Sequence, residues 1–341
     1  MGAQSAIRVG SAFAYSWSVV DVAWSDRVEA AEWIRERLDS WGHFDAGSVI
    51  PRGFQSYLRV LHPAHNEGRS VRWAEVATWS GLPLHRLAQF HSVALPLGAR
   101  PTPKPFTASP MEGSLDWDDT EALVRVLREH TSTSERCHFC VWDGWGWDTA
   151  VAFSLPGQAN PKLPNPVPAA VRSGPRVRMP QRNYLLYEGP IQAALADVGG
   201  SGQTPQLWWP KDRAWCVASE IDFAWSYVGG SAQLTSQLSD EQLEVLPADA
   251  DDQVSRVEPW VEERAKEAAQ RLREAGEVII ETGVGVYRAK LTPRRLRTPL
   301  FEDQAEYGNG YNSRRPSPLQ DTAGDDDLVR HLVDGLITLV S

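Results

Sequence analysis

Two carboxylates, Glu220 and Asp222, stand two residues apart at the end of a predicted strand over residues 215–221. Residues i and i+2 of a strand face the same side, which would place the two groups about 7 Å apart. That separation suits an acid–base pair or a divalent metal. With Asp143, they predict a hydrolase or transferase site in a Trp-lined cleft. In the alternative interpretation Asp222 caps a turn and Glu220 pairs with Arg213.

Cysteine spacing suggests a second kind of site. Cys137 and Cys140 form a CxxC pair, and Cys216 is the only other thiol. A structural zinc needs four ligands, so Cys216 and a histidine would have to approach the pair. Residues i and i+3 of a strand face opposite sides, however, and free cysteines are often buried. We therefore expect packed thiols and no cofactor, with a zinc-stabilised module as the weaker hypothesis.

The chain contains 15 Trp residues. They are concentrated in two segments, residues 208–231 and residues 142–147. A buried Trp ring removes ~150–250 Å² from water. Each segment is therefore either the centre of a core or a surface that binds a flat, apolar group. Rings in Gly-containing loops can stack on ligands. The ligand-binding candidates are Trp142, Trp145, Trp147, Trp208, Trp209, Arg213 and Tyr227.

Length and charge restrict the class of protein. With 341 residues the chain exceeds the size of one hydrophobic core, so one large domain with an appendage, or two domains, is expected. The net charge of −10 argues against non-specific binding to nucleic acid or to anionic membranes. No apolar run approaches the ~18 residues of a membrane span, and no signal peptide is evident. Three Cys fit a reducing compartment, so we expect a cytoplasmic protein.

Hydrophobic periodicity predicts an α+β main domain over residues 1–250. Helices are predicted at residues 26–38 and 118–130, where apolar residues recur with a period near 3.6. Strands are predicted at residues 54–61, 138–142, 183–188 and 215–221. Together they indicate a mixed or antiparallel sheet with peripheral helices. Seven Pro residues make residues 156–180 an irregular connection.

A second, smaller region is predicted over residues 255–341. A capping box formed by Ser255 and Glu258 begins a helix that runs to Ala275, and a hairpin follows at residues 277–291. Residues 292–325 are polar and rich in turn-forming types, so we expect them to be loosely ordered. A final helix at residues 325–340 carries a wide apolar stripe, which must dock on its own core or on a partner. The region is predicted to be a helix–hairpin–helix appendage.

Several strings of residues resemble one family. They include Trp142-Asp143-Gly144-Trp145-Gly146, Trp209-Pro210-Lys211-Asp212-Arg213-Ala214-Trp215-Cys216-Val217 and Tyr227-Val228-Gly229-Gly230-Ser231. On these strings, residues 30–250 resemble a family of uncharacterised bacterial proteins. That family has no assigned activity, so the resemblance gives no residue a catalytic role.

The sequence favours binding over catalysis. It contains no GxSxG elbow, no HExxH motif and no P-loop ending, which are the familiar signals of a nucleophile, a zinc protease and a nucleotide site. We expect a non-catalytic binding or interaction protein that uses its Trp-rich surface. Its partner would be another protein or a small ligand, and the helix at residues 325–340 could serve as a docking element.

Overall fold

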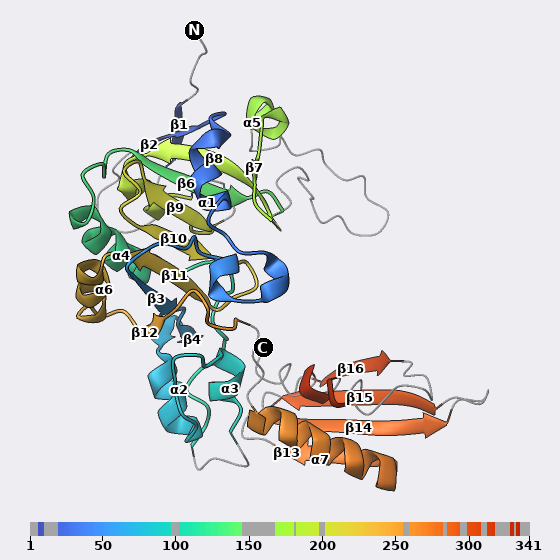
Figure 1. The fold of residues 1–341 in the computed structure, drawn as a ribbon. Coiled ribbons are helices and arrows are strands. Elements are labelled where there is room, and N and C mark those ends of the chain that lie inside the picture. The colour runs from blue at the N-terminus through green and yellow to red at the C-terminus, as the bar shows by residue number, and fades with distance from the viewer. Residues whose placement is uncertain are drawn as a thin grey trace. The chain divides into compact units, whose positions relative to one another are not determined.

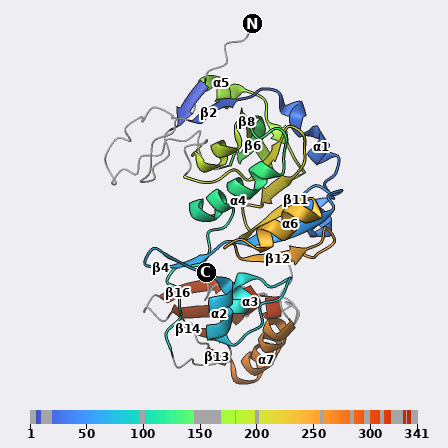
Figure 2. The same cartoon turned by 90° about the vertical axis from the view of Figure 1, so that its left-hand side faces the viewer.

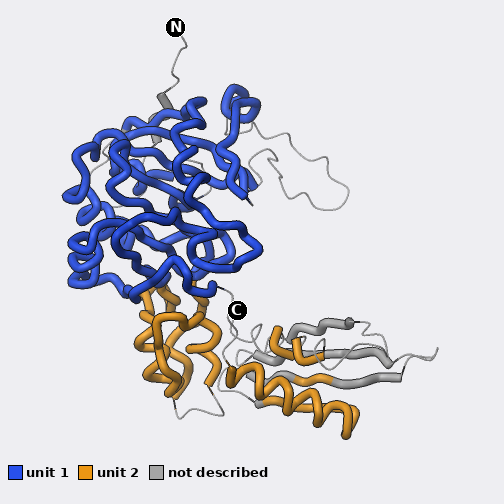
Figure 3. Tube along the Cα trace, in the orientation of Figure 1, with its two compact units in different colours: residues 1–62, 111–254 blue, residues 63–110, 255–341 orange. Residues whose placement is uncertain are grey.

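The chain forms two compact units in a computed structural model. The structure describes residues 6–9, 20–96, 102–144, 168–180, 182–197, 202–254, 259–281, 285–293, 299–307, 312–317, 328–330 and 332–334. Unit 1 comprises residues 1–62 and 111–254, and unit 2 comprises residues 63–110 and 255–341 (Figure 3). This differs from the predicted division, because residues 63–110 leave unit 1. The chain leaves unit 1 after His62 and re-enters it at Met111. These two residues are in contact, with His62 Nδ1 2.6 Å from the Met111 carbonyl oxygen.

Unit 1 is built on one ten-stranded sheet (Figure 1), whose strand order is β1-β2-β8-β6-β9-β10-β11-β3-β12, with β7 also paired to β8. All of its described strand pairs are antiparallel, so the fold is α+β, as predicted. The strands are β1 (Ala6–Val9), β2 (Val20–Trp24), β3 (Ser56–Leu61), β6 (Cys137–Trp142), β7 (Val177–Arg178), β8 (Asn183–Gly189), β9 (Leu207–Pro210), β10 (Cys216–Ser219), β11 (Trp225–Gly230) and β12 (Val245–Ala248).

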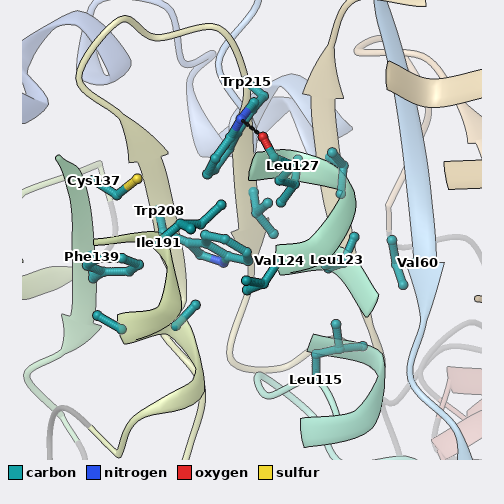
Figure 4. Close-up of a cluster of buried hydrophobic side chains, with 14 of the residues drawn as sticks. Val60, Leu115, Leu123, Val124, Leu127, Cys137, Phe139, Ile191, Trp208 and Trp215 are labelled. Carbon is teal, nitrogen blue, oxygen red and sulfur yellow. Dashed lines mark hydrogen bonds between the residues drawn. The ribbon is translucent and has the colours of Figure 1, made fainter. Parts of the chain in front are cut away.

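One face of this sheet carries the hydrophobic core. Alternation along β6 directs Cys137, Phe139 and Val141 to this face, where they are buried with Trp208. Helices α4 (Trp117–Glu129) and α6 (Ala232–Ser239), the 3-10 turn η4 (Ile191–Leu195) and the short helix α5 (Ala169–Ser173) contribute residues to the same core. Figure 2 shows α4 and α6 in front of the strands. The Trp215 indole N–H donates to the Leu127 carbonyl at 2.9 Å, which ties β10 to α4 (Figure 4).

The opposite face is covered by the segment after β2. The predicted helix at residues 26–38 is shorter in the structure, where the 3-10 turn η1 (Val28–Ala31) leads into α1 (Glu32–Arg35). No side-chain hydrogen bond caps η1, although Asp26, the first residue of the predicted helix, is of a type that commonly caps helices. Trp33 is buried and meets Trp209 edge-on, with ring centroids 6.2 Å apart. Two more 3-10 turns, η2 (Trp41–His43) and η3 (Ala46–Ser48), follow.

The first part of unit 2, residues 63–110, packs around aromatic rings. Strands β4 (Ala64–Asn66) and β5 (Arg69–Val71) form a hairpin, and the helices α2 (Trp73–Ser80) and α3 (Phe90–Ala94) follow. Trp73 and Phe106 both pack on Phe90, with ring centroids 5.3 and 5.2 Å away. Buried aromatic pairs of this kind contribute more than their area alone.

The second part of unit 2 is a four-stranded antiparallel sheet with one long helix. Helix α7 (Pro259–Ala275) precedes β13 (Glu277–Glu281) and β14 (Gly285–Pro293), which form the predicted hairpin. The prediction that residues 292–325 are loosely ordered was wrong in part, because β15 (Pro299–Tyr307) and β16 (Asn312–Ser317) extend the sheet. Strand β15 pairs with β14, and β16 pairs with β15, which provides backbone hydrogen-bond partners that a polar composition does not reveal.

The described part of the apolar stripe near the C-terminus is buried within the chain itself. Of the predicted helix at residues 325–340, the structure describes residues 328–330 and 332–334. Leu328, Leu332 and Val333 are buried. These three side chains are therefore not available for docking on a partner, which was the other possibility that the sequence allowed. In the described part of the chain, no helix has both the length and the apolar character that crossing a bilayer requires.

Candidate functional site

The three candidate catalytic carboxylates lie in ion pairs. Strand β10 ends at Ser219, so Glu220 and Asp222 belong to the turn after it. Glu220 accepts hydrogen bonds from Arg182 at 3.0 and 2.7 Å, and Asp222 accepts one from the same guanidinium at 2.8 Å. Asp143 accepts from Arg176 at 2.9 Å. The expectation that Glu220 pairs with Arg213 was wrong, because the two residues stand at opposite ends of β10.

Arg182 organises this group of carboxylates. Glu220 is 5% exposed, and burial raises its pKa although the hydrogen bonds from Arg182 oppose the shift. Burial, with a smaller contribution from Asp222, also raises the pKa of Glu112. The guanidinium lies 5.4 Å from the ring centroid of Trp142. A buried carboxylate held by an arginine that is itself packed on an indole is typical of a structural ion pair.

The cysteine candidates are packed thiols. Cys137, Cys140 and Cys216 are free and buried, and burial raises the pKa of all three, that of Cys137 to about 12. Cys137 belongs to the core face of β6, and Cys140 points to the other face. Within the described residues, no three His, Cys, Asp or Glu side chains gather in a way that could hold a metal ion. The zinc hypothesis therefore has no support in the geometry.

The Trp208–Tyr227 segment forms core rather than an exposed aromatic surface. Trp208, Trp209 and Tyr227 are all buried, at 3% exposure or less. The predicted surface was wrong for these rings: Trp208 packs on Trp215 in the core, Trp209 contacts His138 and Trp33, and Tyr227 packs on Trp225. Trp142 is partly exposed and lies beneath Arg182. The other two candidates, Trp145 and Trp147, lie outside the described residues.

A cavity in unit 1 that is rich in charged and polar side chains lies elsewhere, over a single row of side chains that crosses four strands. In the sheet register, Ala23 of β2 pairs with Glu188 of β8, Glu188 with His138 of β6, and His138 with Trp209 of β9. The cavity above them has a volume of about 700 Å³. We call it the basic pocket, and it is lined by Ala23, Arg27, Glu29, Ala30, Glu135, Arg136, Cys137, His138, Glu188, Gly189, Trp209, Lys211 and Arg213.

A second cavity of about 440 Å³ lies between η1 and α1 on one side and residues 175–179 on the other. Neither cavity is lined by Asp143, Glu220 or Asp222. The candidate carboxylates therefore do not border either of these two spaces, whereas two other predicted residues, Trp209 and Arg213, border the larger one.

Three cations of the basic pocket form no ion pair with any carboxylate in the described part of the chain. Arg27 forms an ion pair with Glu188, which also accepts from the Ser25 hydroxyl at 2.7 Å. Among the described residues, Arg136, Lys211 and Arg213 form no ion pair with a carboxylate. All three are exposed at the rim of the pocket. Their positive charge is available to a bound anion.

The loop that carries two of these cations is held by Asp212. Its carboxylate accepts from the Thr131 hydroxyl at 2.8 Å, from the Ser132 amide and hydroxyl at 2.8 and 2.9 Å, and from the Ala214 amide at 3.2 Å. Partial burial opposes its ionisation, but these hydrogen bonds lower the pKa of Asp212 overall. The next residue, Arg213, has a left-handed φ of 59°. Asp212 thus fixes the turn from which Lys211 and Arg213 project.

His138 supplies an uncharged imidazole at the floor of the pocket. Its ring stacks on Trp209 with centroids 5.2 Å apart and an interplanar angle of 11°. Burial lowers the pKa of His138, and Arg27, Lys211 and Arg213 lower it further against the opposing effect of Glu188. Nε2 lies 3.9 Å from a carboxylate oxygen of Glu188. The imidazole is therefore neutral at pH 7 and adds hydrogen-bonding capacity without charge.

Sequence reasoning found part of this site. Trp209 and Arg213 were candidates, but His138, Glu188, Arg27 and Arg136 were not singled out as members of one site. The available signal was the string Trp209-Pro210-Lys211-Asp212-Arg213, in which an acidic residue separates two cations. His138 was considered only as a possible zinc ligand. Its role depends on strand pairings that link residues far apart in the chain.

Comparison of the chain with protein-family models, with curated proteins and with solved structures finds no match. The resemblance to a bacterial family stays a prediction, and the function has to be argued from the geometry of the site.

Proposed function

We propose that unit 1 is a binding module for a small anionic ligand, which occupies the basic pocket. The observation that carries this proposal is the convergence of Arg136, Lys211 and Arg213 on one cavity of about 700 Å³ without acidic partners among the described residues. Cavities that bind small molecules commonly have volumes of roughly 300–1,000 Å³ and a few polar groups that fix orientation. An anion would satisfy all three cations at once.

The pocket favours binding over covalent chemistry. The one cysteine that borders it, Cys137, directs its buried side chain to the core face of β6, and burial raises its pKa to about 12, so no thiolate faces the pocket at neutral pH. The alternative, a hydrolase or transferase that uses Asp143, Glu220 and Asp222, has less support, because each of these carboxylates is held by an arginine. We retain the predicted binding protein and replace its Trp-rich surface with the basic pocket.

We also propose that the protein acts in the cytoplasm. Support comes from the three free thiols, all of them buried. Disulfides form and persist in oxidising compartments, whereas unpaired cysteines are common in a reducing cytosol.

Isothermal titration calorimetry of the full chain with inorganic phosphate and with citrate tests the binding proposal. We expect the K211A/R213A double variant to bind at least about tenfold more weakly, since hydrogen bonds to charged groups contribute roughly 1.5–3 kcal/mol each. R128A is the matched control, because Arg128 is an exposed cation on α4 that does not line the pocket. Failure of the wild-type chain to bind either anion, or equal binding by the double variant, would contradict the proposal.

A further inference from the structure

We infer that the ligand of the basic pocket is a phosphomonoester, that is, a small organic molecule with a terminal dianionic phosphate, rather than a carboxylate. This inference rests on the proposed function of the same pocket. It depends on the number of cations that have no carboxylate partner among the described residues, on how their loops are held together and on the space that remains around them.

The cations match a tetrahedral dianion better than a carboxylate. Arg136 and Lys211 are adjacent, because the Lys211 amide donates to the Arg136 carbonyl at 2.9 Å, and Arg213 follows in the same turn. A phosphate group offers three peripheral oxygens and close to two negative charges to these three side chains. A carboxylate has two coplanar oxygens and one charge. It would leave at least one cation without a partner.

Asp212 keeps its flanking cations available. A carboxylate between Lys211 and Arg213 could neutralise either of them by an ion pair. Instead its oxygens accept from Thr131, Ser132 and Ala214, so its charge is stabilised by neutral donors. The same hydrogen bonds join the loop before β6 to the turn between β9 and β10. Asp212 is therefore a positioning residue, which sets the spacing of the cations without touching the ligand.

The remaining space requires an organic group. A volume of about 700 Å³ is far larger than a bare phosphate needs. Besides the cations and the floor residues described above, the lining includes the small residues Ala23, Ala30 and Gly189 and two rim carboxylates, Glu29 and Glu135. Neither Glu29 nor Glu135 forms an ion pair among the described residues. They can accept hydrogen bonds from hydroxyl or amino groups of the ligand, so a hydroxylated or aminated carbon skeleton fits the rest of the cavity.

Calorimetric titration of the full chain at pH 7.5 with three probes tests the inference. The probes are glycerol 3-phosphate, inorganic phosphate and glycerate, which separate the phosphate group from the carbon skeleton and from a carboxylate. We expect glycerol 3-phosphate to bind at least tenfold more tightly than glycerate, with inorganic phosphate in between. D212A should reduce this preference at least fivefold while R128A preserves it. The unfolding midpoint of each variant shows whether it is folded, and T131V, which removes one donor to Asp212, replaces D212A if that variant is unfolded.

The outcomes separate this inference from the function on which it rests. If glycerate binds as tightly as glycerol 3-phosphate and both depend on Lys211 and Arg213, the pocket binds anions but the phosphomonoester is overturned. If D212A binds all three probes as the wild type does, the positioning role of Asp212 is wrong. If none of the probes binds, both the inference and the proposed function fail.

Discussion

Two aspartates in unit 1, Asp212 and Asp222, show how their partners decide the role of a carboxylate. Asp222 is exposed and shares the guanidinium of Arg182 with buried Glu220. Asp212 accepts hydrogen bonds from hydroxyl and backbone amide groups, and Lys211 and Arg213 on either side of it border the basic pocket. The first arrangement is a structural ion pair, and the second leaves two cations beside the pocket for which we propose a binding role. Both residues have the same chemistry, so only their surroundings distinguish them.

A stability measurement tests the structural role of Arg182. The R182A variant leaves Glu220 buried without its cation, and removal of one partner of a buried ion pair costs roughly 3–5 kcal/mol. We therefore expect the free energy of unfolding to fall by about 3 kcal/mol. D222N should change it by no more than about 0.5 kcal/mol, because the Asp222 side chain is 69% exposed. Chemical denaturation of the three proteins gives these values, and equal stability of R182A and D222N would refute the structural ion pair.

At the level of elements, strand alternation creates the site. Along β6, Cys137, Phe139 and Val141 enter the core, so His138 must face the opposite side. Antiparallel pairing then aligns His138 with Glu188 on one neighbour and Trp209 on the other. A register shift of one residue would turn His138 into the core and break the row. The position of the pocket floor is thus a direct consequence of the sheet register.

A glycine substitution tests how tightly the segment around Gly113, where the chain re-enters unit 1, packs on the turn after β10. Gly113 has a φ of 71°, and a Cβ there would lie 2.6 Å from the Ile221 Cα. Gly202 has a similar φ of 73° but nothing within 4 Å. We expect G202A to cost about 1 kcal/mol from backbone strain alone. G113A should cost at least ~2 kcal/mol more, because backbone has to move. Urea unfolding of both variants provides the comparison, and equal losses would contradict the close packing.

At the level of the whole molecule, each compact unit contains a buried histidine that must stay neutral. His62 belongs to unit 1 and His91 to unit 2. Burial lowers the pKa of each of them from 6.5 to about 4. The unfolded chain therefore takes up protons near pH 6.5, and the native chain does so only near pH 4. The stability that depends on the neutral form is complete above pH 6.5 and is lost as the pH falls towards 4.

Each histidine should contribute up to about 3 kcal/mol to this acid sensitivity, from 1.36 kcal/mol per pKa unit. We expect the free energy of unfolding to drop between pH 7.5 and pH 4.5, and the H62Q variant to show a smaller drop even if its stability at pH 7.5 is lower. The H43A variant is the control, because the His43 side chain is 66% exposed. An unchanged pH dependence in H62Q would show that His62 is not responsible.

Much of the local structure was predictable from sequence. The helix predicted at residues 118–130 is α4, and the hairpin predicted at residues 277–291 is β13 and β14. Both elements are predicted by hydrophobic periodicity and by turn-forming residues, which are properties of a short stretch of sequence. The shortened helix after Asp26 and the strands β15 and β16 were not predictable in the same way. Their extent depends on packing and pairing with distant segments.

By itself, the sequence determined the α+β class and the alternation of side chains along β6. It also identified Trp209 and Arg213 as ligand-binding candidates. The tertiary structure decided that Glu220 pairs with Arg182, that the Trp208–Tyr227 rings are core, and that residues 63–110 leave unit 1. It also decided that Ala23, Glu188, His138 and Trp209 form one row. The physical reason is that periodicity is a local property of the chain. Strand register and ion-pair partners are set by the packing of the whole sheet, in which residues far apart in sequence become neighbours.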